Sequence, residues 1–131
     1  MFELDQRLKN DCHVLATKNQ CEILLMNNSL VPWLIIVPQT DKIELYELDL
    51  ELKQKIYQTI DLLSEFIVQT YDIEKLNVAA LGNVVSQLHI HIIGRSKNDM
   101  AWPNPVWGNI ESQKYSDDQI KKIRMKLLAF I

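Results

Sequence analysis

Short apolar runs, each bounded by polar residues or proline, predict the strands of this chain. The runs at 21–27 ("CEILLMN") and 33–38 ("WLIIVP") have the length and branched apolar composition of buried strands. Two later runs, 75–81 and 88–95, are predicted to be strands joined by a turn. Because the run at 33–38 is apolar on both sides, we expect it to be a central strand covered on both faces.

Two stretches have helical spacing instead. From Asp49, a plausible N-cap, to about Tyr71, apolar residues recur every three or four positions. A second helix is expected to begin at Ser116, because Gln119 stands at the capping-box spacing. Between them, 101–108 ("AWPNPVWG") holds two prolines and two tryptophans, which predicts an ordered loop. The pattern indicates an α+β domain, an antiparallel sheet with one long helix and a C-terminal helix.

Composition narrows the class of protein. The 131 residues are 47% hydrophobic and 24% charged, with a net charge of −3. This predicts one globular domain and argues against a nucleic-acid partner, since such proteins usually carry a basic surface. No apolar run is long enough to span a membrane and the N-terminus lacks a signal-peptide pattern, so we expect a cytoplasmic protein without a membrane partner. Cys12 and Cys21 lie outside any Cys-x-x-Cys pattern and are expected to be free thiols.

The stretch "SQLHIHIIGR" (86–95) carries the strongest chemical signal, because it places two of the three histidines one residue apart in an apolar run. Residues two apart on a strand share a face. Gln87, His89 and His91 are therefore expected to line one side of the strand, while Leu88 and its alternating apolar neighbours face the core.

Three interpretations of this strand compete. The histidines could be surface residues on an edge strand, or two ligands of a zinc site, for which no third ligand stands at a diagnostic spacing. The third interpretation is nucleophilic catalysis, in which a neutral imidazole attacks phosphorus and forms a phosphohistidine. Such a site needs a side chain that holds the ring in one tautomer and donors for the phosphoryl oxygens. Periodicity alone does not choose between metal binding and catalysis.

The motif resembles the signature of the histidine triad (HIT) family, His-x-His-x-His-x-x, with Gln87 in place of the first histidine. The segments "VPWLIIVP", "LNVAALGN" and "AWP" resemble the flanking parts of that family, and the whole is similar to a proteobacterial branch of HIT hydrolases with this replacement. The resemblance covers roughly 1–110. It implies a HIT-like fold with an antiparallel sheet of about five strands, in a single domain over 1–131 with 111–131 as a C-terminal helical extension.

The resemblance also implies an activity. His89 falls on the nucleophile that takes up a nucleoside monophosphate, and His91 on the histidine that helps to bind the phosphoryl group. The expected reaction is cleavage of a nucleoside–phosphate–X bond, in a dinucleoside polyphosphate or a nucleoside phosphoramidate. The substrate would be a purine nucleotide, the protein a homodimer, and neither a metal nor another cofactor would be needed.

Further site residues follow from the same resemblance. Asn27 lies close to the family's ribose-contacting position, and Asn83 and Ser86 occupy the turn that faces phosphate or leaving group. Gln87 can donate a hydrogen bond but cannot titrate, so better leaving groups would be favoured. Trp33 replaces another usual histidine and would either stack on a base or fill the core. These two departures leave open a catalytically weak nucleotide-binding dimer, or a His-x-His metal-binding protein, as alternatives.

Four other residues have simpler expectations. Arg95 is expected to form a surface ion pair rather than to bind phosphate, and His13 to be structural. Trp102 and Trp107 are expected to pack the C-terminal loop onto the sheet or a dimer interface, with closure of a nucleotide pocket as the alternative.

Overall fold

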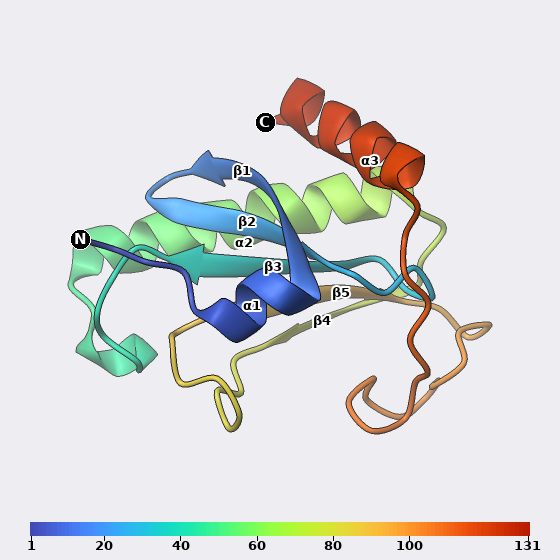
Figure 1. The fold of residues 1–131 in the computed structure, drawn as a ribbon, viewed down its shortest axis with the longest axis horizontal. Coiled ribbons are helices and arrows are strands. Elements are labelled where there is room, and N and C mark those ends of the chain that lie inside the picture. The colour runs from blue at the N-terminus through green and yellow to red at the C-terminus, as the bar shows by residue number, and fades with distance from the viewer.

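A five-stranded antiparallel sheet organises the computed structural model, which describes residues 1–131 (Figure 1). The strand order across the sheet is β1-β2-β3-β5-β4. The elements along the chain are α1 (Gln6–Asp11), β1 (Cys12–Lys18), β2 (Cys21–Met26), β3 (Trp33–Pro38), η1 (Leu45–Glu47), α2 (Leu50–Thr70), β4 (Lys75–Ala79), β5 (Ile90–Arg95) and α3 (Asp117–Phe130). The expected α+β class, with an antiparallel sheet of five strands, one long helix and a C-terminal helix, is therefore confirmed.

Strand β3 is central, as its two-sided apolar sequence predicts. It pairs with β2 on one side and β5 on the other, and all six of its residues are buried. Strands β4 and β5 lie where the pattern places them but are shorter by two residues each, since β4 ends at Ala79 and β5 begins at Ile90.

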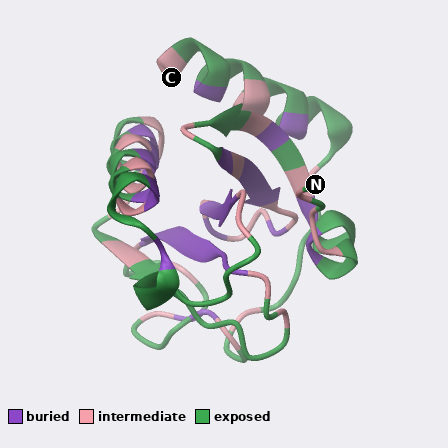
Figure 2. Cartoon of the chain, turned by 90° about the vertical axis from the view of Figure 1, so that its left-hand side faces the viewer, coloured by how far each residue is buried: buried purple, intermediate pink, exposed green.

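One face of the sheet packs against α2 and α3. Figure 2 shows α2 along this side, and the core between sheet and helices contains 17 buried residues. The predicted caps are present, because the Asp49 carboxylate accepts a 2.8 Å hydrogen bond from the amide of Leu52, and Ser116 and Gln119 form a capping box. The close approach of α2 requires Gly94 on β5, since a Cβ there would stand 2.8 Å from Cγ2 of Ile67.

The opposite face is covered by α1 and by the loop of residues 96–110. Both lie on the side of the sheet away from α2 (Figure 1). A second cluster of nine buried residues fills this layer, including Trp33 and Ile35 from β3, Ile93 from β5, Leu8 from α1 and Val106 from the loop. It is the layer in which the histidines lie.

Three elements, α1, β1 and η1, have no counterpart in the sequence pattern. Helix α1 is six residues long and buries only Leu8, and β1 carries an irregular register between Val14 and Ala16 that breaks the alternation. The thiols of Cys12 and Cys21 are free and buried, and burial raises their pKa values to about 12 and about 11. None of the helices is both long and apolar enough to serve as a membrane span.

Candidate active site

The two motif histidines lie side by side on the α1 face of the sheet. His91 is on β5, paired with Ile35 of β3, and His89 immediately precedes the strand. Their ring centroids are 4.9 Å apart, and the residues are only 7% and 5% exposed. Leu88, Ile90 and Ile92 enter the core on the other face, which confirms the apolar half of the predicted alternation.

The backbone of its own strand sets the tautomer of His89. Its Nδ1 lies 2.7 Å from the carbonyl oxygen of Gln87. A carbonyl oxygen can only accept, so Nδ1 carries the proton. The lone pair of this imidazole is therefore on Nε2.

His91 has the opposite tautomer. The indole N–H of Trp33 donates a 3.0 Å hydrogen bond to Nδ1 of His91, so the proton of the neutral ring is on Nε2. Burial, assisted by the neighbouring His89, lowers the pKa of His91 from 6.5 to about 4. Near neutral pH the ring is uncharged and presents an N–H donor at Nε2.

Neither Nε2 atom has a partner within the protein. The one buried side-chain nitrogen or oxygen that lacks a hydrogen bond is Nε2 of His13 on β1. Since Nε2 of His89 and of His91 are also unpaired but are not enclosed in this way, both reach solvent. An acceptor and a donor therefore stand next to each other at an open surface.

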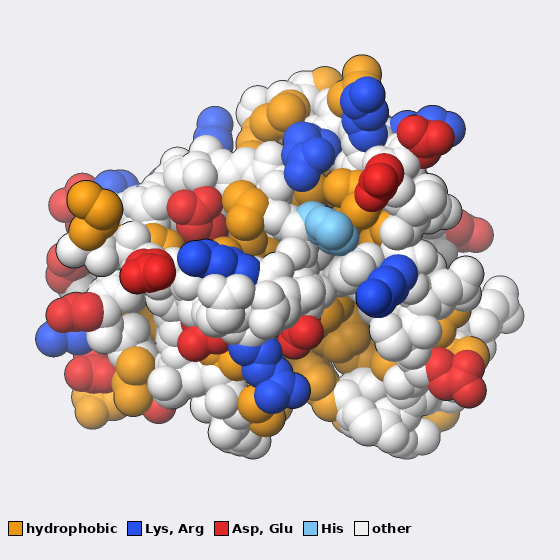
Figure 3. Space-filling view, viewed as in Figure 1, with side chains coloured by type: hydrophobic (Ala, Val, Ile, Leu, Met, Phe, Trp, Pro, Cys, Tyr) orange, Lys and Arg blue, Asp and Glu red, His pale blue; other side chains and the backbone are white.

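Both rings line a cavity of about 330 Å³, here called the histidine cavity. Its volume is within the range of sites that bind small molecules. Hydrophobic side chains lie deep between the loops at the lower edge of the space-filling view (Figure 3). The cavity is lined by Arg7, Leu8, Asp11, Met26, Ile35, Leu81, Gly82, Asn83, Val84, Val85, His89, His91 and Trp107. Asn83 is thus the one predicted substrate-binding residue on the same wall as the histidine pair.

Ser86 and Gln87 lie in a neighbouring cavity of about 260 Å³, which also contacts His89. The Gln87 carboxamide is held by the N-terminal segment, accepting from the amide of Asp5 at 2.8 Å and donating to the carbonyl oxygen of Glu3 at 2.9 Å. Gln87 therefore does not line the histidine cavity, although it is adjacent to His89 in the motif.

Asn27 and Trp33 line a third cavity, of about 420 Å³, which shares Asp11, Met26 and Trp107 with the histidine cavity. The carboxamide oxygen of Asn27 accepts from the amide of Tyr115. Trp33 is 5% exposed, so its ring fills the core and supports His91, which agrees with the second of its two expected roles.

The 96–110 loop places Trp107 against the site. Its ring meets His91 edge-on with centroids 5.0 Å apart, and Trp33 in the same manner at 5.8 Å. Trp107 thereby packs the loop onto the sheet and also forms one wall of the histidine cavity.

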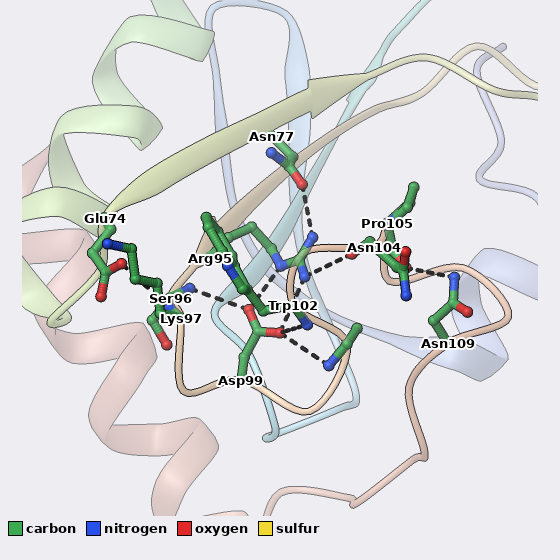
Figure 4. A network of polar contacts seen from close by, with 11 residues as sticks. Glu74, Asn77, Arg95, Ser96, Lys97, Asp99, Trp102, Asn104, Pro105 and Asn109 are labelled. Atoms are coloured by element: carbon green, nitrogen blue, oxygen red, sulfur yellow. Dashed lines mark hydrogen bonds and ion pairs between the residues drawn. The ribbon is translucent and has the colours of Figure 1, made fainter.

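Arg95 holds this loop in place. The expected ion pair is present, with Asp99, but it is buried and not at the surface. Arg95 is 2% exposed, because the loop folds over its side chain. Its guanidinium binds Asp99 through two hydrogen bonds, 2.8 and 3.1 Å long, and also donates to Asn77 and to the carbonyl oxygen of Asn104 (Figure 4). The guanidinium carbon of Arg95 lies over the ring of Trp102, 5.8 Å from the ring centroid.

Asp99 completes the network from the loop side. Burial opposes ionisation of its carboxyl group, but hydrogen bonds from Arg95 and from backbone amides outweigh that effect and lower its pKa. Its oxygens accept from the amides of Ser96, Ala101 and Trp102. Arg95 and Asp99 thus organise the loop, and neither lines the histidine cavity.

Sequence reasoning missed several residues of the cavity wall. Arg7, Leu8 and Asp11 come from α1, which is too short to have a periodic pattern. For Met26 a signal existed, since alternation along β2 places it on the same face as Leu24. A zinc site at His89 and His91 would need a third protein ligand. No three His, Cys, Asp or Glu side chains are grouped closely enough to hold a metal ion.

Known proteins are similar to this chain over most of its length. The HIT domain model matches residues 7–98. A histidine triad protein from Marinobacter aquaeolei VT8 is 42% identical, with 99% of this chain and 96% of that chain covered and a TM-score of 0.94. A histidine triad (HIT) protein from Sinorhizobium meliloti 1021 is 34% identical over 99% of this chain and 97% of that chain, also with a TM-score of 0.94.

More distant structures share the fold alone. Plasmodium falciparum diadenosine triphosphate hydrolase is 19% identical, covers 99% of this chain and 78% of its own, and gives a TM-score of 0.63. No curated protein matches the chain significantly. The family model and the two bacterial structures suffice for one conclusion: the chain belongs to the histidine triad (HIT) family.

Proposed function

We propose that this protein is a nucleotide hydrolase or transferase that cleaves a nucleoside–phosphate–X bond with His89 as the nucleophile. The observation that carries the proposal is the pair of opposite tautomers at the histidine cavity. His89 offers a lone pair on Nε2, and His91 offers an N–H beside it. A nucleophile next to a fixed donor is what attack on a phosphoryl group requires.

Each contact has a role in this reaction. As Nε2 of His89 bonds to phosphorus, the bond from phosphorus to X breaks and its electron pair leaves with X. The carbonyl oxygen of Gln87 stabilises the positive charge that the ring acquires in this step. The Nε2–H of His91 donates to a phosphoryl oxygen, and its neutral ring stays in that state because the pKa lies near 4. Water then attacks the nucleotidyl-histidine and releases the nucleoside monophosphate.

The other residues that line the histidine cavity have the chemistry needed to bind a nucleoside. Leu8, Met26 and Val85 supply apolar surface for a base, and Asn83 supplies a polar group at the loop. Members of the HIT family are commonly nucleotide hydrolases or transferases, and the Plasmodium protein that shares the fold is a diadenosine triphosphate hydrolase. Both facts support a nucleotide, with a purine as the expected base.

Intact mass spectrometry after a brief quench, without acid, tests the proposal. Diadenosine triphosphate or an adenosine 5′-phosphate aryl ester should add one nucleotidyl group to the wild-type protein. The His89→Ala variant should show no adduct and no turnover. His13→Ala is the matched control, because His13 is the one histidine outside the three cavities described, and it should behave as wild type. Equal turnover by wild type and His89→Ala would remove the proposal.

A nucleotide-binding protein with weak chemistry is the second candidate. It is favoured by the engagement of Gln87 with the N-terminal segment and by the burial of Trp33, because neither position supplies a titratable group to the cavity. Calorimetry with adenosine monophosphate, alongside the mass measurement, separates the two. Binding without any adduct favours this candidate.

We also propose a homodimer, as the family resemblance implies. Strands β1 and β4 end the sheet, and the outer edge of each is unpaired within the chain, which supports association through a sheet edge. Light scattering at micromolar concentration should give twice the chain mass of 15.3 kDa, and the mass of a single chain would contradict the proposal.

A further inference from the structure

Cleavage of a P–X bond leaves an electron pair on X, so the groups that could protonate X decide which substrates react. The histidine cavity has four titratable side chains on its wall, Arg7, Asp11, His89 and His91. Arg7 and Asp11 form an ion pair of 3.7 Å at a largely exposed position. In this ion pair the guanidinium of Arg7 is the hydrogen-bond donor and the carboxylate of Asp11 is an acceptor only. Neither is a general acid.

The histidines do not supply a proton either. In the reaction proposed above, His89 becomes bonded to phosphorus through Nε2, and its remaining proton is held on Nδ1 by the Gln87 carbonyl oxygen. His91 is a neutral ring, because Trp33 occupies Nδ1 and burial holds the pKa near 4. A neutral imidazole donates a hydrogen bond from Nε2 but does not transfer that proton readily.

Gln87 stands where a third histidine would complete the motif, and it has no proton to give. Both ends of its carboxamide bond to the backbone of Glu3 and Asp5, and the side chain lies outside the histidine cavity. The histidine cavity therefore has a nucleophile and donors for the phosphoryl oxygens, but no acid for a leaving group that lies within it.

We infer that the site selects phosphate-anhydride substrates, in which a nucleoside 5′-phosphate is joined to a phosphate or a second nucleotide, over phosphoramidates, in which it is joined to an amine. The inference rests on the proposed function. As Nε2 of His89 bonds to phosphorus, the P–O bond breaks and its electron pair stays on the departing phosphate oxygen, which is stable as an anion. Water then bonds to phosphorus, the P–N bond breaks, its pair returns to Nε2, and the proton of the water passes to solvent.

The same step with an amine is unfavourable here. Breaking that P–N bond would leave the electron pair on nitrogen, which needs a proton as the bond breaks. No group on the wall of the histidine cavity delivers it. General acid catalysis typically contributes 10²–10⁴-fold to such a step, so discrimination of about 100-fold or more is expected.

Wild-type protein and matched substrates test this inference. Diadenosine triphosphate is compared with an adenosine 5′-phosphoramidate, and a series of adenosine 5′-phosphate phenyl esters varies only the acidity of the leaving phenol. The anhydride should exceed the phosphoramidate by about 100-fold in kcat/KM, and the esters should slow steeply as the phenol becomes less acidic. Similar kcat/KM for anhydride and phosphoramidate, with the His89 adduct formed from both, would overturn this inference and leave the proposed function standing. Absence of the adduct with every substrate would overturn both.

A variant adds a second readout. Gln87→His introduces a titratable group in the neighbouring cavity, which His89 also lines, and should narrow the kcat/KM ratio between anhydride and phosphoramidate. Gln58→His, on the exposed side of α2, is the matched control and should leave the ratio unchanged. Should Gln87→His fail to fold because the bonds to Glu3 and Asp5 are lost, the ester series on wild type still decides the question.

Discussion

Trp33 and His91 lie 58 positions apart in the chain, and the indole N–H of the first donates to Nδ1 of the second over 3.0 Å. The bond crosses from β3 to β5, which are neighbours in the sheet. It fixes the proton of His91 on the nitrogen that faces the histidine cavity. A residue with no titratable proton thereby determines which atom of an adjacent imidazole can donate.

Replacing Trp33 by Phe should release this constraint. The variant leaves Nδ1 of His91 buried without a donor, at a cost of about 1–3 kcal/mol in unfolding free energy. The ¹⁵N chemical shifts of the ring should change from those of a single Nε2–H tautomer to those of a mixture. Trp107→Phe is the control, because Trp107 contacts the ring edge-on without a hydrogen bond. Unchanged His91 shifts in Trp33→Phe would contradict the assignment.

The low pKa of His91 makes stability depend on pH. An unfolded histidine binds a proton near pH 6.5, whereas His91 does so only near pH 4 in the folded protein. Between these values the unfolded state holds more protons, so stability falls as pH decreases from about 6.5 to about 4, by about 3 kcal/mol in total. Urea unfolding across this range measures it. His91→Gln should lose this part of the dependence, and His13→Gln should retain it.

Asp99→Asn should destabilise the protein by about 3–5 kcal/mol, because it leaves the Arg95 guanidinium buried without its counter-charge. Hydrogen exchange should show the lost protection concentrated in the 96–110 loop. Glu51→Gln removes the partner of Lys55 in an exposed ion pair of the same i,i+4 spacing and should change stability by less than about 0.5 kcal/mol. Equal effects of the two substitutions would show that the Arg95 network does not hold the loop.

Gly94→Ala should cost about 1–3 kcal/mol through overpacking, since the new Cβ would stand 2.8 Å from Ile67 and 2.9 Å from Ile73. Gly108→Ala is a useful comparison, because no atom lies within 4 Å of a Cβ there. Its cost of about 1–2 kcal/mol should come instead from the positive φ of 77°. Thermal unfolding of the two variants separates crowding from backbone strain, and a neutral Gly94→Ala would contradict the close packing of α2.

The sequence predicted those parts of the fold that depend on residues close together in the chain, such as helix caps and the alternation along strands. The caps at Asp49 and Ser116 and the central position of β3 follow from residues close together in sequence. The alternation around His89 also predicted which side chains face the core. Helix α1 was not predictable in this way, because its single buried residue, Leu8, gives no period.

Contacts between distant segments could not be read from the sequence. The burial of Arg95 depends on Asn77 of β4 and on a loop that folds back over the strand, and no spacing in the sequence indicates that convergence. Likewise, the engagement of Gln87 by Glu3 and Asp5 joins residues more than 80 positions apart. Both contacts change what the motif residues are free to do.

The placement of the three tryptophans has an optical consequence. Trp33 lies under His91, Trp102 stacks on Arg95, and Trp107 forms a wall of the histidine cavity, so all indole emission arises from one side of the sheet. The layer beneath α2 and α3 contributes none. A ligand that enters the histidine cavity beside Trp107 should therefore change the intrinsic tryptophan fluorescence. Ligand binding to the unlabelled protein can then be measured by this change.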